Sequence, residues 1–182
     1  MDNGALNYRR FLDGDDKSFE RIVDDFKNGL MIFLNGYVRN IYTAERLTED
    51  TFFVLASKKP GENKKYSFKT WIYALGREKA LQLIKKNISP ENMSIDEIRE
   101  MQDDEESLVR EFLQSDEKIY DCVCAGQLSE EERQILWLSD FEKFSNDEIS
   151  FILKIKPDTI SGKIETAYDN LKKIKRKEKI EI

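Results

Sequence analysis

Apolar residues recur three or four positions apart through most of the N-terminal half of the chain, which is the spacing of a buried helix face. The strongest stretch opens at Asp15, the expected N-cap, and continues to Ile41. A cluster of turn-forming residues at 60–63 interrupts the pattern further along. Four helices are therefore predicted, at residues 8–12, 15–41, 44–58 and 67–86.

The apolar residues of the last two helices are expected to point into a shared core. They are Leu47, Phe52, Val54 and Leu55 in the third helix, and Phe68, Trp71, Ile72, Leu75, Ala80, Leu83 and Ile84 in the fourth. This pattern indicates a helical bundle in the N-terminal half.

The C-terminal half contains successive signals for the start of a helix. Ser129 with Glu132, and Ser145 with Glu148, have the Ser-x-x-Glu spacing of a capping box. Pro157 then stands at a helix-starting position. A longer helix followed by two short helices joined by a tight turn is typical of a helix-turn-helix.

Charge is segregated along the 182-residue chain. The whole chain carries −6, but residues 58–86 hold nine bases and two acids, whereas residues 89–117 hold two bases and eleven acids. The acidic segment is polar and is predicted to be a linker. The expected fold class is all-α, with one helical domain at residues 1–88, an acidic linker at 89–117 and a second helical domain at 118–182.

Composition excludes most enzyme classes. The chain has no His, which removes the commonest general base and zinc ligand, and no nucleophile with a paired base is visible. Cys122 and Cys124 are expected to pack within a helix, and the acidic run 103–106 lacks the spacing of a calcium loop. We therefore expect no catalytic residue, no metal and no cofactor.

The longest apolar run is far shorter than the roughly 18 residues of a membrane helix, and the N-terminus lacks the pattern of a signal peptide. The expected location is the cytoplasm, without membrane insertion.

Bases alternate with aromatic residues before and within the fourth predicted helix. The set comprises Lys64, Lys65, Tyr66, Phe68, Lys69, Trp71, Tyr73 and Arg77. Cations neutralise phosphates and each stacked base contributes about 1–3 kcal/mol, so this composition suits single-stranded nucleic acid. The alternative, that Phe68 and Trp71 form only a core stripe, is favoured for those two rings alone. The preceding loop, however, offers little to a core.

The last predicted helix would lie in the major groove of duplex DNA and read base edges from its N-terminal residues. Its exposed candidates are Asp158, Thr159, Ser161, Gly162, Lys163, Glu165 and Thr166. The basic tail that begins at Lys172 would add phosphate contacts, although a basic run at a helix end also complements the helix dipole.

Five short motifs follow one another along the chain: GDDKSFE at 14–20, AERLTEDTF at 44–52, FKTWIYALGR at 68–77, LSEEER at 128–133 and SNDEIS at 145–150. In this order they resemble the small sigma-70-type RNA polymerase initiation factors of the extracytoplasmic-function kind. The resemblance covers nearly the whole chain. It implies a bacterial protein with a sigma region 2-like domain followed by a sigma region 4-like helix-turn-helix.

The resemblance also implies the partners. They would be the RNA polymerase core, through its β′ clamp helices and β flap, promoter DNA, and an anti-sigma factor. Polymerase performs the chemistry, and the chain, which is not an enzyme, would recognise and melt the promoter. The acidic linker would extend toward the RNA path of polymerase.

Three sets of contact residues follow from the same resemblance. The polymerase contacts would be Glu45, Glu49 and Asp50. The contacts to the melted −10 element would be Asn63, Lys64, Lys65, Tyr66, Lys69, Trp71 and Arg77. The contacts to the −35 duplex would be Asp158, Thr159, Ser161, Lys163, Thr166 and Lys172.

Departures from the family pattern leave an alternative open. Arg46 stands where the family usually has Asp, and Glu165 adds a charge that repels phosphate. We expect weak binding of the free protein to duplex DNA, with polymerase supplying avidity. The alternative is a sigma-like module that binds polymerase or an anti-sigma factor without promoter recognition. A plain helix-turn-helix repressor would leave the basic-aromatic segment unused.

Overall fold

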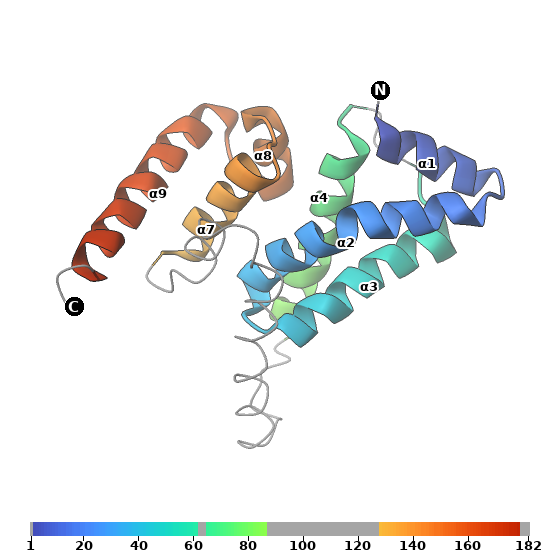
Figure 1. The fold of residues 1–182 in the computed structure, drawn as a ribbon, viewed down its shortest axis with the longest axis horizontal. Coiled ribbons are helices and arrows are strands. Elements are labelled where there is room, and N and C mark those ends of the chain that lie inside the picture. The colour runs from blue at the N-terminus through green and yellow to red at the C-terminus, as the bar shows by residue number, and fades with distance from the viewer. Residues whose placement is uncertain (1, 62–64, 87–127, 179–182) are drawn as a thin grey trace, which may run out of the picture. The chain divides into compact units, whose positions relative to one another are not determined.

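A computed structural model describes residues 2–61, 65–86 and 128–178, with side chains described as far as residue 174. Within these residues every regular element is a helix (Figure 1). The chain divides into two compact units, one centred on α1 to α4 and the other on α7 and α9. The predicted linker 89–117, the acidic run 103–106 and the pair Cys122 and Cys124 lie outside the described residues.

The N-terminal unit contains four helices, α1 (Asn3–Leu12), α2 (Asp16–Val38), α3 (Ile41–Lys58) and α4 (Phe68–Lys85). The predicted break between the second and third helices was wrong by three residues, because Ile41 opens α3 instead of closing α2. Arg39 ends α2 in the left-handed conformation (φ 48°), and Asn40 caps α3 by accepting a hydrogen bond from the N–H of Thr43 (2.8 Å). Asn is among the residues most favoured at this position.

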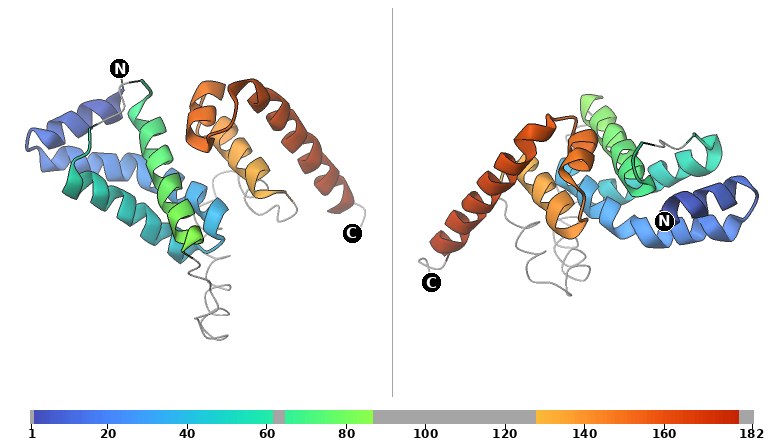
Figure 2. Two further views of the ribbon diagram at one scale, coloured as in Figure 1. Left: turned by 180° about the vertical axis from the view of Figure 1, so that it is seen from behind. Right: turned by 90° about the horizontal axis from the view of Figure 1, so that it is seen from above.

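The core of this unit is built around α2, which contacts the other three helices. In Figure 2, α4 crosses both α2 and α3. Gly76 permits the close crossing, since a Cβ there would lie 3.0 Å from Cδ1 of Leu30 on α2. The largest fully buried side chains are Tyr8, Ile22, Leu30, Phe33, Leu34, Leu55, Phe68, Ile72 and Tyr73.

The predicted core stripes were too wide. The last turn of α4 is exposed on several sides, and Ile84, predicted to point inward, is 47% exposed. Val54, Trp71, Leu75 and Leu83 are only partly buried. Helical spacing marks an arc of the helix, but the neighbouring helices decide how much of that arc is covered.

The C-terminal part of the described chain contains α7 (Glu130–Leu136), a π-helical turn (Trp137–Phe141), α8 (Asn146–Leu153) and α9 (Pro157–Glu178). Both predicted capping boxes are present, since Ser129 and Ser145 each exchange hydrogen bonds with the Glu three residues on. The predicted helix lengths were wrong. The long helix is the last one, at 22 residues, whereas α7 has 7 and α8 has 8.

The π-helical turn was not predicted. The N–H of Glu142 donates to the carbonyl of Trp137, five residues back (3.1 Å), and the rings of Trp137 and Phe141 stack with centroids 5.0 Å apart. The turn continues α7 and places Phe141 against the cluster that joins α7 to α9. That cluster contains Leu128, Leu136, Ala167 and Ile174, with Phe141 and Leu171 at its edge.

Candidate nucleic-acid interface

The loop from α3 to α4 presents a cation and an aromatic ring just before a helix N-terminus. Lys65 is exposed, and its Nζ lies 5.1 Å from the centre of the Tyr66 ring, which is half-buried. Ser67 then caps α4 by accepting a hydrogen bond from the N–H of Thr70 (3.1 Å). The partial positive charge of this helix N-terminus is already matched by the carboxylate of Asp2, which accepts a hydrogen bond from the N–H of Phe68, so phosphate contact at this loop rests on Lys65.

Two aromatic residues of the predicted stacking set belong to the core. Phe68 is 2% exposed and Tyr73 is 1% exposed, so neither ring presents a face to a base. Trp71 is half-buried, and its ring lies 5.6 Å from that of Tyr8 and 5.5 Å from that of Phe68. The rings that lie outside the core at this end of the unit are therefore those of Tyr66 and Trp71, both half-buried.

The remaining predicted −10 contacts do not form one stripe. Successive helix residues are rotated by about 100°, which places Lys69 and Trp71 on nearly opposite sides of α4. Arg77 lies further along the helix and donates from Nε to the hydroxyl of Tyr37 on α2 (2.9 Å). The structure thus brings Lys65, Tyr66 and Trp71 to one end of α4 and leaves Arg77 apart. Asn63 and Lys64 lie outside the described residues.

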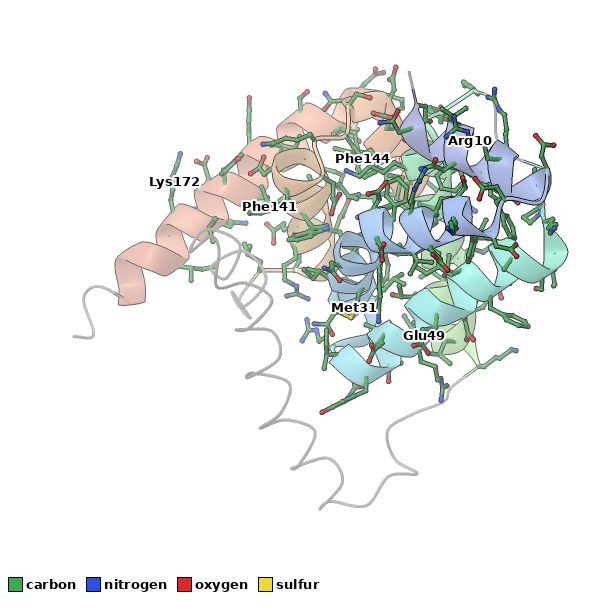
Figure 3. The ribbon with its side chains drawn as sticks, turned by 45° about the vertical axis from the view of Figure 1, so that its right-hand side comes forward. Arg10, Met31, Glu49, Phe141, Phe144 and Lys172 are labelled. Atoms are coloured by element: carbon green, nitrogen blue, oxygen red, sulfur yellow. The ribbon has the colours of Figure 1, made fainter. Side chains whose placement is uncertain are left out.

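The outer face of α3 carries the predicted polymerase contacts. Glu49, labelled in Figure 3, and Asp50 are exposed. Glu45 is engaged within the unit, because its carboxylate forms an ion pair with Lys27 of α2 (3.1 Å) and remains 44% exposed. Arg46 lies on the same exposed face.

One residue of this face was missed by the sequence analysis. Phe53 is 68% exposed, the most exposed large hydrophobic side chain among the described residues. Positions 46, 49, 50, 53 and 57 are all exposed and recur at helical spacing, so Phe53 lies within the charged face. The adjacent aromatic pair Phe52 and Phe53 was an available signal, since neighbouring helix positions point about 100° apart and cannot share one buried direction.

The face of α9 that would enter a DNA groove is polar and weakly charged. Asp158, Thr159, Ser161, Glu165 and Thr166 are exposed. The hydroxyl of Ser161 accepts a hydrogen bond from the side-chain amide of Asn146 on α8 (2.9 Å).

The two predicted cations of α9 are both engaged within the unit. Lys163 forms an ion pair with Glu131 of α7 and is 38% exposed. Lys172, labelled in Figure 3, is exposed and lies 3.6 Å from the carboxylate of Asp169. The exposed cations that flank the start of α9 are Lys154 and Lys156, which lie in the turn before it.

Glu132 of α7 helps to set the position of α9. Partial burial opposes ionisation of Glu132, but hydrogen bonds from Ser129 and from the amide of Asn170 on α9 (2.6 Å) outweigh it, so the pKa of Glu132 is lowered. The hydroxyl of Tyr168 adds a hydrogen bond to the carboxylate of Asp140. These contacts fix the rotation of α9, and hence which of its residues face outward.

Two further classes of site are absent from the described part of the chain. It contains no group of three or more His, Cys, Asp or Glu side chains placed to hold a metal ion. None of the helices described is long and apolar enough to span a membrane.

Two solved structures match this chain over most of its length. The structure of CnrH in complex with the cytosolic domain of CnrY matches with a TM-score of 0.63 and 14% identity, covering 95% of this chain and 97% of that one. The structure of the sigma factor RpoE in complex with the anti-sigma factor NepR, from Bartonella quintana, matches with a TM-score of 0.62 and 16% identity, covering 88% and 98%. The chain has the fold of a sigma factor. Neither a family model nor a curated protein matches the sequence.

The match extends over both units and nearly all of each compared chain. The predicted all-α fold class is confirmed. At these identities the likeness concerns the fold, and the roles of individual side chains are argued from their own surroundings.

Proposed function

We propose that the chain is a transcription initiation factor of the extracytoplasmic-function sigma kind, which binds RNA polymerase core and directs it to promoters in the bacterial cytoplasm. The observation that carries the proposal is the sigma-factor fold, matched over 88% of the chain, with a cation-aromatic pair at the end of α4. Polymerase would perform the chemistry, and this chain would contribute binding energy and strand separation.

Each exposed surface is assigned a separate contact in this proposal. The face of α3 with Glu49, Asp50 and Phe53 would dock on the β′ clamp helices, because an exposed aromatic residue ringed by charge is typical of a protein interface. Lys65, Tyr66 and Trp71 would hold the unpaired strand of the −10 element by phosphate contact and stacking. The C-terminal unit would contact the β flap and the −35 duplex through α9.

Promoter opening tests the proposal directly. The purified protein would be added to bacterial core polymerase with a promoter library, and the DNA of open complexes would be sequenced. We expect selection of a two-part promoter. Trp71→Ala should lower open-complex formation by about 5-fold or more, since a base stacked on an aromatic ring contributes about 1–3 kcal/mol. Lys65→Ala removes a phosphate contact and should act in the same direction.

The controls separate strand contact from docking and folding. Lys85→Ala, at the opposite end of α4, removes an exposed cation of the same helix and should leave opening unchanged. Phe53→Ala should weaken core binding, whereas Ile84→Ala, which truncates another exposed apolar side chain, should not. Core binding without any promoter opening would overturn the proposal.

A second candidate is a sigma-like module that binds polymerase or an anti-sigma factor without reading promoters. Two observations favour it. The outward face of α9 exposes Asp158 and Glu165, which repel phosphate, and the sigma factor RpoE is bound to an anti-sigma factor in the structure that matches this chain. The same experiment decides, since this module would bind core polymerase and leave the library unselected.

A further inference from the structure

The N-terminal helix holds both ends of the loop that precedes α4. We propose that Asp2 and Tyr8 are positioning residues, which fix this loop so that Lys65 and Tyr66 meet the unpaired strand in a set geometry. The role rests on the proposed function, but the contacts that suggest it are independent of any comparison.

Tyr8 holds the start of the loop. Its side chain is fully buried (0% exposed), and its hydroxyl donates to the carbonyl of Pro60 (2.8 Å), a residue 52 positions away in sequence. Phe11, one helical turn further along α1, lies under Lys59, whose Nζ is 4.8 Å from the ring centre. Lys59 itself has φ 43°, so the chain leaves α3 in a left-handed conformation that these contacts support.

Asp2 holds the end of the loop. One carboxylate oxygen accepts a hydrogen bond from the N–H of Ala5 (3.1 Å) and caps α1. The other oxygen accepts a hydrogen bond from the N–H of Phe68, the first residue of α4. One carboxylate therefore lies at the N-termini of two helices, where a negative charge is stabilising, and joins them across 66 residues of sequence.

Close packing holds α1 against the start of α4. A Cβ at Gly4 would lie 2.7 Å from Cδ1 of Phe68, so α1 approaches the start of α4 more closely than any other residue would allow. The ring of Tyr8 lies 5.3 Å from that of Phe68 and 5.6 Å from that of Trp71. The residue that anchors the loop thus also supports the tryptophan assigned to stacking.

Positioning of this kind matters because a binding group works only when its neighbours fix its place. Lys65 and Tyr66 are separated from Ser67, the cap of α4, by at most one residue, so a shift of the α4 start moves both directly. Neither Asp2 nor Tyr8 is assigned a contact with DNA, and each would act through the loop alone.

The test removes one hydroxyl and follows two readouts. Tyr8→Phe keeps the ring and deletes the bond to Pro60, while Tyr73→Phe makes the same change at another buried tyrosine of the unit. With core polymerase bound to saturation, Tyr8→Phe should lower promoter opening, measured by permanganate reactivity, by about 2- to 10-fold, the equivalent of one hydrogen bond. Tyr73→Phe should leave opening unchanged. Asp2→Ala should act in the same direction as Tyr8→Phe.

The second readout is amide hydrogen exchange in the chain without polymerase. Tyr8→Phe should raise exchange at residues 59–61 and 65–68 and leave α2 and α3 protected. If the wild-type protein opens no promoter, the proposed function fails, and the exchange measurement alone decides whether α1 fixes the loop. Unchanged exchange would overturn the positioning role. So would full promoter opening by Tyr8→Phe.

Discussion

Trp71 and Tyr73 are two residues apart on α4, yet their surroundings differ. Tyr73 is 1% exposed, with its ring 5.3 Å from that of Phe33, whereas Trp71 lies half-buried at the edge of the aromatic cluster around Tyr8. A rotation of about 200° around the helix separates the two positions, and this alone makes one a core residue and leaves the other partly accessible.

Truncation of these two side chains should therefore have unequal effects on stability. Tyr73→Ala should lower the free energy of unfolding of the N-terminal unit by about 3–5 kcal/mol, the usual cost of deleting a buried aromatic ring. Trp71→Ala should cost clearly less, because part of its ring already faces solvent. Urea unfolding followed by circular dichroism gives both values. Equal losses would contradict the burial assigned to Trp71.

The carboxylate of Glu132 couples the stability of the C-terminal unit to pH. Its pKa is lowered from the ordinary 4.5, so the ionised form is favoured in the folded protein. The stability that it contributes is fully present above about pH 5 and is lost as the pH falls through the folded-state pKa. Glu132→Gln should then be less stable than the wild type at neutral pH, and the difference should shrink in acid.

Urea midpoints of the two proteins at neutral pH and below about pH 4 measure this difference. The chain has only 2 Trp, Trp71 and Trp137, so a Trp71→Phe background leaves fluorescence that reports the C-terminal unit alone. A difference that stays constant across this range would mean that Glu132 acts by packing rather than by charge.

Helix boundaries were predicted well where a capping signal marks them. Ser129 and Ser145 each cap the helix expected of them, because capping depends on residues within one turn. The break at Arg39 and Asn40 was missed because Tyr37 and Ile41 keep helical spacing across it, so the apolar pattern runs through two helices as if they were one.

The candidate site was harder to predict, since it depends on contacts between distant segments. Sequence reasoning proposed Lys65, Tyr66 and Trp71 from local composition, and their contact with nucleic acid stays a prediction. It missed Asp2, Tyr8 and the exposed Phe53, whose environments are set by helices far away in sequence. The π-helical turn after α7 likewise has no local signal, because it depends on Phe141 reaching the α7–α9 cluster.

The capping box at Ser145 predicts a measurable contribution to the stability of the C-terminal helices. Ser145→Ala removes the hydroxyl that exchanges hydrogen bonds with Glu148 at the start of α8, and should destabilise the C-terminal unit by about 1 kcal/mol. Thr166→Ala, on the exposed side of α9, should instead be neutral or slightly stabilising, because Ala has the higher helix propensity. Trp137 fluorescence during urea unfolding measures both, and opposite signs are expected.

The distribution of charge over the whole protein predicts its behaviour toward duplex DNA. The chain carries −6, the outward face of α9 exposes Asp158 and Glu165, and Lys163 is paired with Glu131. Affinity of the protein alone for a promoter duplex should therefore stay in the non-specific range, with a Kd weaker than about 1 μM near physiological salt. Fluorescence anisotropy measures it. Nanomolar, sequence-dependent binding without polymerase would contradict this reading of α9.

The contacts of α1 also bear on how the protein is made. Asp2 and Tyr8 leave the ribosome before their partners Phe68 and Pro60, which follow 66 and 52 residues later. Helix α1 must wait for most of the N-terminal unit before it can form both bonds, so the hydrogen bond to Phe68 closes only when α4 begins to emerge. A nascent chain from which only α1, α2 and α3 have emerged would therefore lack the bond from Asp2 to Phe68.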